Sequence, residues 1–122
     1  MVNKLTADEF REKIFDYQRD QEWSFKGEHP VIIDFYADWC APCRLVAPIL
    51  EKLSTQFDGK VDFYKIDTER EHELSAVFGI SSIPSLLFIP QNSNPVMSQG
   101  ALPEQEIKRI IGEVLEVSLE AA

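Results

Sequence analysis

Only two cysteines and two histidines occur among the 122 residues of this chain. The low cysteine count excludes a disulfide-rich scaffold, because a domain of this size does not depend on one small covalent loop to fold. It also argues against a zinc site. Cys40 and Cys43 would need two further ligands, and His29 and His72 are far apart in the sequence with no ligand spacing.

Basic residues are also scarce: 12 Lys and Arg stand against 21 Asp and Glu, which gives a formal net charge of −9. Proteins that bind nucleic acid neutralise phosphates with Lys and Arg, so no nucleic-acid partner is expected. Long apolar runs are missing too, since none approaches the roughly 18 residues of a membrane-spanning helix. The acidic balance is best explained as a solvated surface that favours solubility.

The length and a hydrophobic share of 44% fit a single domain with its own core, expected over residues 1–122. We expect an N-terminal helix and connector over residues 1–29 and the core of the domain over 30–118. The first residues hold no apolar segment of the kind found in a secretory signal, so a cytoplasmic location is expected. A periplasmic protein whose signal had been removed would look the same, and this alternative stays open.

The apolar pattern predicts alternating helices and strands. Thr6 and Glu9 have the spacing of a capping box, and Phe10, Ile14 and Tyr17 follow at helical intervals. After a polar connector the predicted elements are a strand over 31–37, a helix with apolar residues from Val46 to Phe57, a strand over 61–66, a helix capped by Thr68 and Glu71 and ended by Gly79, a hairpin of strands 85–89 and 96–99, and a last helix with Pro103 in its first turn. This order predicts an α/β fold: one mixed sheet with helices on both faces.

The segment Trp39-Cys40-Ala41-Pro42-Cys43 lies where the first long strand gives way to a helix. Two thiols at this spacing form and reopen a small disulfide, which is typical of a redox motif. The N-terminus of a helix stabilises a thiolate through its free amides and partial positive charge. We expect Cys40 to be the exposed nucleophile and Cys43, one turn further on, the buried resolving thiol. An inert structural disulfide is the alternative, although so short a loop would stabilise the fold little.

Asp34 lies inside the apolar strand, six residues before Cys40. A carboxylate there is costly unless it is paired or protonated. One interpretation is an edge strand with Asp34 facing water. The other is a buried acid with a raised pKa that accepts the proton of Cys43, with Lys65 close enough to tune it.

Several landmarks of the chain resemble the thioredoxin family. In order they are Asp34-Phe35-Tyr36-Ala37-Asp38-Trp39-Cys40-Ala41-Pro42-Cys43-Arg44, Pro48, Lys65, Ser82-Ile83-Pro84-Ser85 and Gly100-Ala101-Leu102. The resemblance runs from about residue 30 to 115. It implies a thioredoxin fold, a central mixed β-sheet flanked by helices, with the two cysteines at the N-terminus of a helix.

The resemblance also implies roles for individual residues. Cys40 becomes the nucleophile and Cys43 the resolving thiol, while Asp34 becomes the buried acid and base with Lys65 as its charged neighbour. Pro84 falls on the family's cis-proline, a form that costs only about 0.5–1 kcal/mol over trans. The residues expected to bind the substrate segment are Trp39, Ala41, Pro42, Ile83, Pro84, Gly100 and Ala101.

Three features depart from the family pattern. Ala41 replaces the usual glycine, and Tyr36 stands where a tryptophan is usual. The stretch through Trp23, Phe25 and Gly27 is longer than a minimal member requires and resembles the leaders of periplasmic-type bacterial thioredoxins.

The function implied is that of a thiol-disulfide oxidoreductase that reduces protein disulfides through Cys40 and Cys43. No cofactor and no metal are expected, and we expect a monomer. The partners would be disulfide-containing proteins and a thioredoxin reductase that uses NADPH and FAD, or a membrane electron donor if the protein is exported. Two alternatives stay open: a disulfide oxidant or isomerase in an oxidising compartment, and a thioredoxin-fold interaction module.

Overall fold

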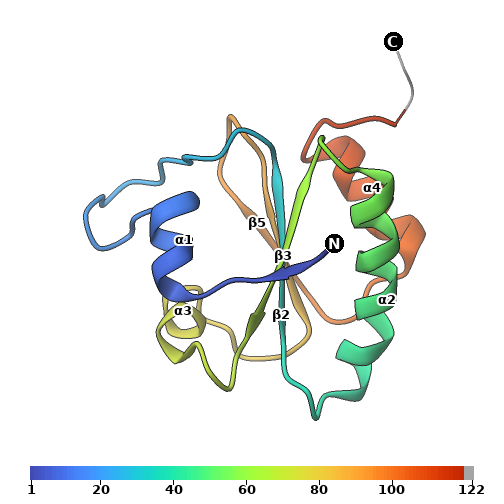
Figure 1. Ribbon diagram of the computed structural model, residues 1–122, viewed down its shortest axis with the longest axis horizontal. Helices are drawn as coiled ribbons and strands as arrows, with labels where there is room; N and C mark the ends of the chain where they lie inside the picture. Colours follow the sequence, from blue (N-terminus) through green and yellow to red (C-terminus); the bar gives the residue numbers. More distant parts are fainter. Residues whose placement is uncertain (120–122) are drawn as a thin grey trace.

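The computed structural model describes residues 1–119, so the last residues of the expected domain, 120–122, lie outside the described residues. Over residues 1–119 a single five-stranded sheet is covered by α1 and α3 on one face and by α2 and α4 on the other (Figure 1). The elements are β1 (Asn3–Lys4), α1 (Ala7–Lys13), β2 (Val31–Tyr36), α2 (Ala41–Gln56), β3 (Asp62–Asp67), α3 (His72–Val77), β4 (Ser85–Ile89), β5 (Val96–Gln99) and α4 (Glu104–Glu113).

The sheet has the order β1-β3-β2-β4-β5, with β2 at its centre. β1, β3 and β2 run parallel, whereas β4 is antiparallel to β2 and forms an antiparallel hairpin with β5. Residues 31–35 of β2 are all buried, as expected for a strand covered on both faces. The expected α/β architecture, the mixed sheet and the hairpin are therefore confirmed.

Two apolar clusters form the core, one on each face of the sheet. The α2 and α4 side includes Leu50, Ile107 and Ile32, whereas the α1 and α3 side includes Phe10 and Ile33. Side chains alternate between the two faces along a strand, so Asp34 shares the face of Ile32. Its carboxylate therefore points toward the layer that contains α2.

The N-terminal helix begins as expected and ends early. Thr6 is its N-cap and forms the predicted capping box with Glu9, but the helix ends at Lys13. The expectation that Tyr17 continues this helix is wrong. The chain turns away after Ile14, whose carbonyl accepts the Lys26 N–H at 2.9 Å, and contacts within the connector replace the next helical turn.

The starts of α3 and α4 differ from the predicted ones. Thr68 Oγ1 donates to the Tyr36 carbonyl at 3.0 Å, so Thr68 and Glu71 do not form the predicted cap, and α3 begins after Glu71 without a side-chain cap. Pro103 is the N-cap of α4 and precedes its first turn. Gly79 does follow the end of α3, with the expected left-handed φ of 61°. The two-residue strand β1 was too short to predict.

Candidate active site

The two cysteines lie at the N-terminus of α2 and form a disulfide, with their Cα atoms 5.3 Å apart. Cys40 is the N-cap, and the Cys43 N–H donates to its Sγ at 3.3 Å. Pro42 fits in the first helical turn because its missing N–H would have no partner inside the helix. The expected position of the motif is confirmed, and the Cys43 amide is placed to stabilise a thiolate on Cys40 after reduction.

Both cysteines are buried in this disulfide form, with 4% of Cys40 and 2% of Cys43 exposed. The expected exposure of Cys40 is therefore not found here. Ala37, Tyr36 and Ile83 pack around the disulfide, and Cys40 Sγ lies 3.8 Å from the Ile83 carbonyl oxygen. Cys40 thus lies beneath the surface, between the end of β2 and the loop before β4.

The residues expected to bind a substrate segment surround this disulfide from separate loops. The Ile83–Pro84 peptide bond is cis, as the resemblance implies. The Gly100 N–H donates to the Pro84 carbonyl at 2.8 Å, which brings the β5–α4 loop beside the proline. Ile83 contacts the disulfide cluster. Trp39, Ala41, Pro42 and Ala101 are exposed, and Trp39 has 67% of its surface accessible.

Asp34 is buried in the central strand, with only 3% of the residue exposed. The interpretation as a water-facing residue on an edge strand is therefore wrong. Its Oδ1 has no hydrogen-bond partner among the described residues. Burial disfavours the carboxylate and raises the pKa of Asp34 from 3.8 to about 7, against the weaker opposing effect of the Lys65 charge.

A cavity of about 190 Å³ connects Asp34 with the disulfide, since Asp34, Cys43 and Lys65 all line it. Arg44 and Ala47 of α2 and the segment from Tyr36 to Asp38 form the rest of its wall. The volume is sufficient for several water molecules, and the unpartnered Asp34 oxygen supplies a polar group to bind one. The structure thus places a buried acid and a cysteine on the wall of the same cavity.

Lys65 lies directly opposite Asp34 in the register of β2 and β3. Its Nζ lies 5.7 Å from the centre of the Tyr36 ring, a cation–π contact between two residues that line the cavity. The sequence alone suggested only a packing role for Tyr36. The tertiary structure shows that Tyr36 also lines the cavity and contacts its cation.

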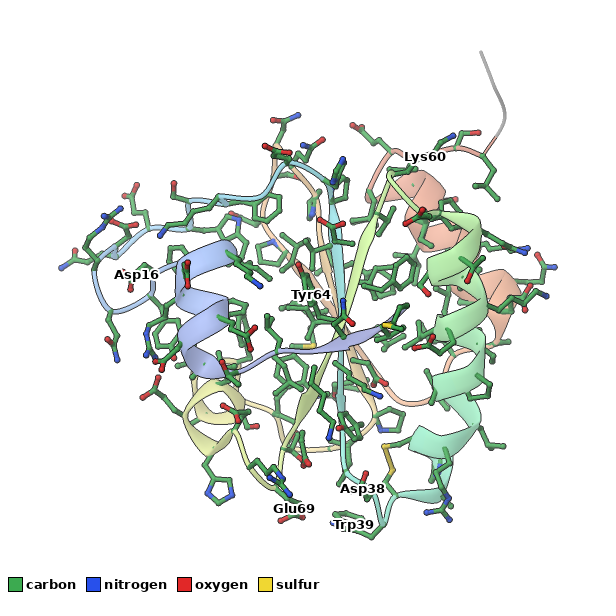
Figure 2. All side chains as sticks on the ribbon, in the orientation of Figure 1. Asp16, Asp38, Trp39, Lys60, Tyr64 and Glu69 are labelled. Atoms are coloured by element: carbon green, nitrogen blue, oxygen red, sulfur yellow. A yellow bond between two sulfur atoms is a disulfide. The ribbon has the colours of Figure 1, made fainter. Side chains whose placement is uncertain are left out.

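Glu69 contacts a predicted site residue, a contact that sequence reasoning missed. Trp39 Nε1 donates to Glu69 Oε1 at 2.7 Å, and Figure 2 shows the two side chains together at the disulfide end of the sheet. The residues are 30 positions apart, so no motif spacing connects them. Their one shared signal is that each follows a strand whose carboxyl end lies at the same edge of the sheet.

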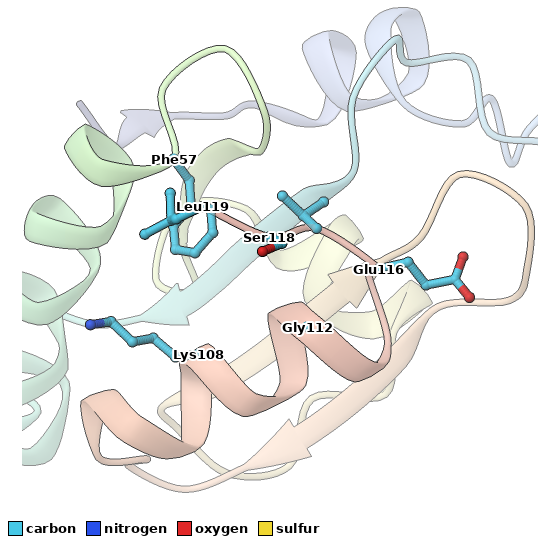
Figure 3. A pocket seen from close by; sticks show the side chains of 7 residues that line it. Phe57, Lys108, Gly112, Glu116, Ser118 and Leu119 are labelled. Atoms are coloured by element: carbon cyan, nitrogen blue, oxygen red, sulfur yellow. The ribbon is translucent and has the colours of Figure 1, made fainter. Parts of the chain in front are cut away.

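A second cavity, of about 620 Å³ and open to solvent, lies between α4, the segment that follows it and Phe57 (Figure 3). Lys108 and Glu116 are its charged residues. Phe57 follows the last residue of α2, and Cys40 precedes the first, so the two sites are about 24 Å apart along a 16-residue helix. Among residues 1–119 no cluster of His, Cys, Asp and Glu is arranged to hold a metal ion, and no helix is long and apolar enough to cross a membrane.

Comparison with known proteins identifies relatives over nearly the whole chain. The family model described as thioredoxin matches residues 1–113. A thioredoxin of Borreliella burgdorferi is 48% identical over 111 residues, which cover 91% of this chain and 95% of the relative. A thioredoxin of Haemophilus influenzae is 37% identical over 84 residues, which cover 69% of this chain and 78% of the relative.

A solved structure agrees with these sequence matches. The crystal structure of chloroplastic thioredoxin z superimposes with a TM-score of 0.78 at 30% identity, over 95% of this chain and 96% of that one. Fold, sequence and the disulfide-forming cysteine pair therefore agree. The chain belongs to the thioredoxin family and is a thiol-disulfide oxidoreductase that reduces protein disulfides.

Proposed function

We propose that Cys40 is the nucleophile and Cys43 the resolving thiol of this oxidoreductase. In the reduced protein the Cys40 thiolate attacks one sulfur of a substrate disulfide. A mixed disulfide forms, and the other substrate sulfur leaves as a thiolate. Cys43 then attacks Cys40 Sγ, which closes the Cys40–Cys43 disulfide and releases the second substrate sulfur. Two electrons pass from the protein to the substrate.

Asp34 is the base for the second step. Cys43 becomes a nucleophile only as a thiolate, and a base with a pKa near the working pH transfers its proton effectively. Asp34 has a pKa of about 7, shares the 190 Å³ cavity with Cys43, and has an oxygen with no hydrogen-bond partner within residues 1–119. This shared cavity is the observation that carries the assignment. Lys65 tunes the carboxylate by favouring its ionised form.

The substrate segment lies beside the disulfide, against Trp39, Ala41, Pro42, Ile83, Pro84, Gly100 and Ala101. Trp39, Ala41, Pro42 and Ala101 are exposed, and an extended segment fits a surface of exposed apolar groups near the disulfide. We call the surface formed by these seven residues the substrate groove. It is supported by three loops that meet at the disulfide: the β2–α2, α3–β4 and β5–α4 connections.

The test of the cysteine roles uses single substitutions. Cys40→Ser should abolish turnover of a disulfide-containing protein substrate. Cys43→Ser should stop turnover after the first step and accumulate a mixed disulfide at Cys40, seen as a mass increase that a small thiol reverses. If Cys40→Ser accumulates the adduct and Cys43→Ser does not, the two roles are reversed.

We further propose a thioredoxin reductase that uses NADPH and FAD as the electron donor and the cytoplasm as the compartment. A net reductant needs a compartment that returns its cysteines to the thiol form, and the cytosol does so. The measurement is the redox state of Cys40 and Cys43 in intact cells, trapped with an alkylating reagent. A mostly reduced pair supports the cytoplasm, whereas a mostly oxidised pair favours export and a membrane donor.

A further inference from the structure

The Trp39 side chain is mostly exposed, yet its indole nitrogen forms a hydrogen bond to a residue of the loop after β3. With 67% of the residue accessible, packing does little to fix its side-chain torsions. Its Nε1–H donates to Glu69 Oε1 at 2.7 Å (Figure 2). We propose that Glu69 is a positioning residue that holds the Trp39 indole in the orientation a protein substrate meets. This inference rests on the proposed place of Trp39 in the substrate groove.

The backbone that carries Glu69 is itself fixed. The Thr68 N–H and Oγ1 both donate to the Tyr36 carbonyl, at 2.9 and 3.0 Å, which fastens the loop to the end of β2. The Glu69 N–H donates to Asp67 Oδ1 at 3.0 Å, and His72 Nε2 lies 2.8 Å from the Glu69 carbonyl oxygen. A carboxylate on so constrained a loop is a preorganised acceptor for the indole.

A hydrogen bond from Arg44 restrains the backbone just before Trp39. Arg44 Nη1 donates to the Asp38 carbonyl at 2.9 Å, which links this turn to the first turn of α2. Arg44 thus restrains the main chain, and Glu69 restrains the ring. The orientation of the indole therefore depends on Glu69, because no other hydrogen bond to its Nε1 occurs among the described residues.

A ring held in its bound orientation loses less conformational freedom when a partner docks on it. Loss of one such hydrogen bond corresponds to about a threefold to tenfold weaker association. We therefore expect Glu69→Ala to raise KM for a protein disulfide by about threefold to tenfold, with kcat within about twofold of the value for the unsubstituted protein. A small disulfide that does not cover the indole should react at an unchanged rate.

The experiment compares Glu69→Ala, Glu69→Gln and the control Glu12→Ala, in which an exposed acid on α1 is removed. Glu69→Ala should raise KM, whereas Glu69→Gln should restore it because a glutamine oxygen also accepts the indole proton. Glu12→Ala should leave KM unchanged. If Glu69→Gln raises KM as much as Glu69→Ala does, the negative charge and not the hydrogen bond is responsible, and the inference is overturned.

A second readout follows the hydrogen bond itself. In Glu69→Ala the Trp39 indole N–H should exchange with solvent faster, measured by NMR, while the indole of Trp23 stays unchanged. Trp39→Phe lacks the donor, so a double-mutant cycle with Glu69→Ala should show non-additive effects on KM. Additive effects, or an unchanged exchange rate, would contradict the inference.

Trp39→Ala separates this inference from the proposed groove. If Trp39→Ala leaves KM for the protein substrate unchanged, the groove assignment fails and the inference fails with it. If Trp39→Ala raises KM and Glu69→Ala does not, the groove assignment survives and only the positioning role of Glu69 is overturned.

Discussion

Asp34 of β2 and Lys65 of β3 lie directly opposite each other in parallel strands, and both line the cavity that reaches Cys43. Their effects on the carboxylate oppose each other. Burial raises the pKa of Asp34 and the Lys65 charge lowers it, and burial has the larger effect, so the pKa is about 7. The protein therefore keeps an acid that changes its protonation state at neutral pH beside its redox pair.

This raised pKa predicts a stability that depends on pH. Between pH 3.8 and about 7 the folded protein holds a proton on Asp34 that the unfolded chain has lost, so stability falls as the pH rises through this range. Asp34→Asn removes the titration. In the oxidised form it should match the original protein near pH 4 and exceed its free energy of unfolding above pH 7 by about 4 kcal/mol.

Denaturant unfolding of both proteins at pH 4, 6 and 8 checks this prediction. The stability difference should grow with pH and level off above about pH 7.5. A difference that is constant from pH 4 to pH 8 would mean that Asp34 does not titrate in the predicted range.

Asp34→Asn should also slow the resolving step, in which Cys43 attacks the mixed disulfide. Without a base, Cys43 depends on the small thiolate fraction it has by itself, so the rate of mixed-disulfide resolution should fall by about 100-fold. The measurement is the decay of a preformed mixed disulfide at Cys40 in single-turnover experiments from pH 6 to 9. The original protein should show a rise near pH 7 that Asp34→Asn lacks; equal rates and pH profiles would rule out the proposed base.

Removal of the Lys65 charge should raise the pKa of Asp34 further. Lys65 favours the ionised carboxylate, so Lys65→Met leaves burial unopposed and moves the pKa above 7. NMR titration of the Asp34 carboxyl carbon in the oxidised protein measures the shift without interference from thiols.

Lys4→Met is the matched control for this titration. Lys4 pairs with Lys65 in the register of β1 and β3, but its side chain is exposed, so it should leave the pKa of Asp34 unchanged. If Lys65→Met lowers the pKa or leaves it in place, Lys65 does not tune this acid.

The reduction potential of the Cys40–Cys43 pair should lie below the cytosolic glutathione poise of about −220 to −260 mV. A protein that delivers electrons to substrate disulfides must be the stronger reductant. Equilibration in thiol and disulfide buffers, followed by alkylation and mass measurement, gives the value. A potential at or above the poise would favour the oxidant or isomerase alternative.

The sequence by itself determined the order of the long helices and strands and the type of chemistry. The spacing of Cys40 and Cys43 at a strand-to-helix junction predicts a redox disulfide, and the alternation of apolar patterns predicts the mixed sheet and its layers. The capping box of Thr6 formed as predicted from neighbours three residues apart, whereas Thr68 and Glu71 have the same spacing and form none, because Thr68 Oγ1 donates to the distant Tyr36 carbonyl. Such short-range signals operate through local backbone geometry, which the sequence contains directly.

The tertiary structure decided what depends on residues distant in the chain. The strand of Asp34 is central because β3 and β4 pair on its two sides, and only this pairing buries the acid. The cavity beside Cys43 and the bond between Trp39 and Glu69 arise where separate loops meet at one edge of the sheet. Burial and pKa follow from how the whole chain packs around a group, and no local pattern contains that information.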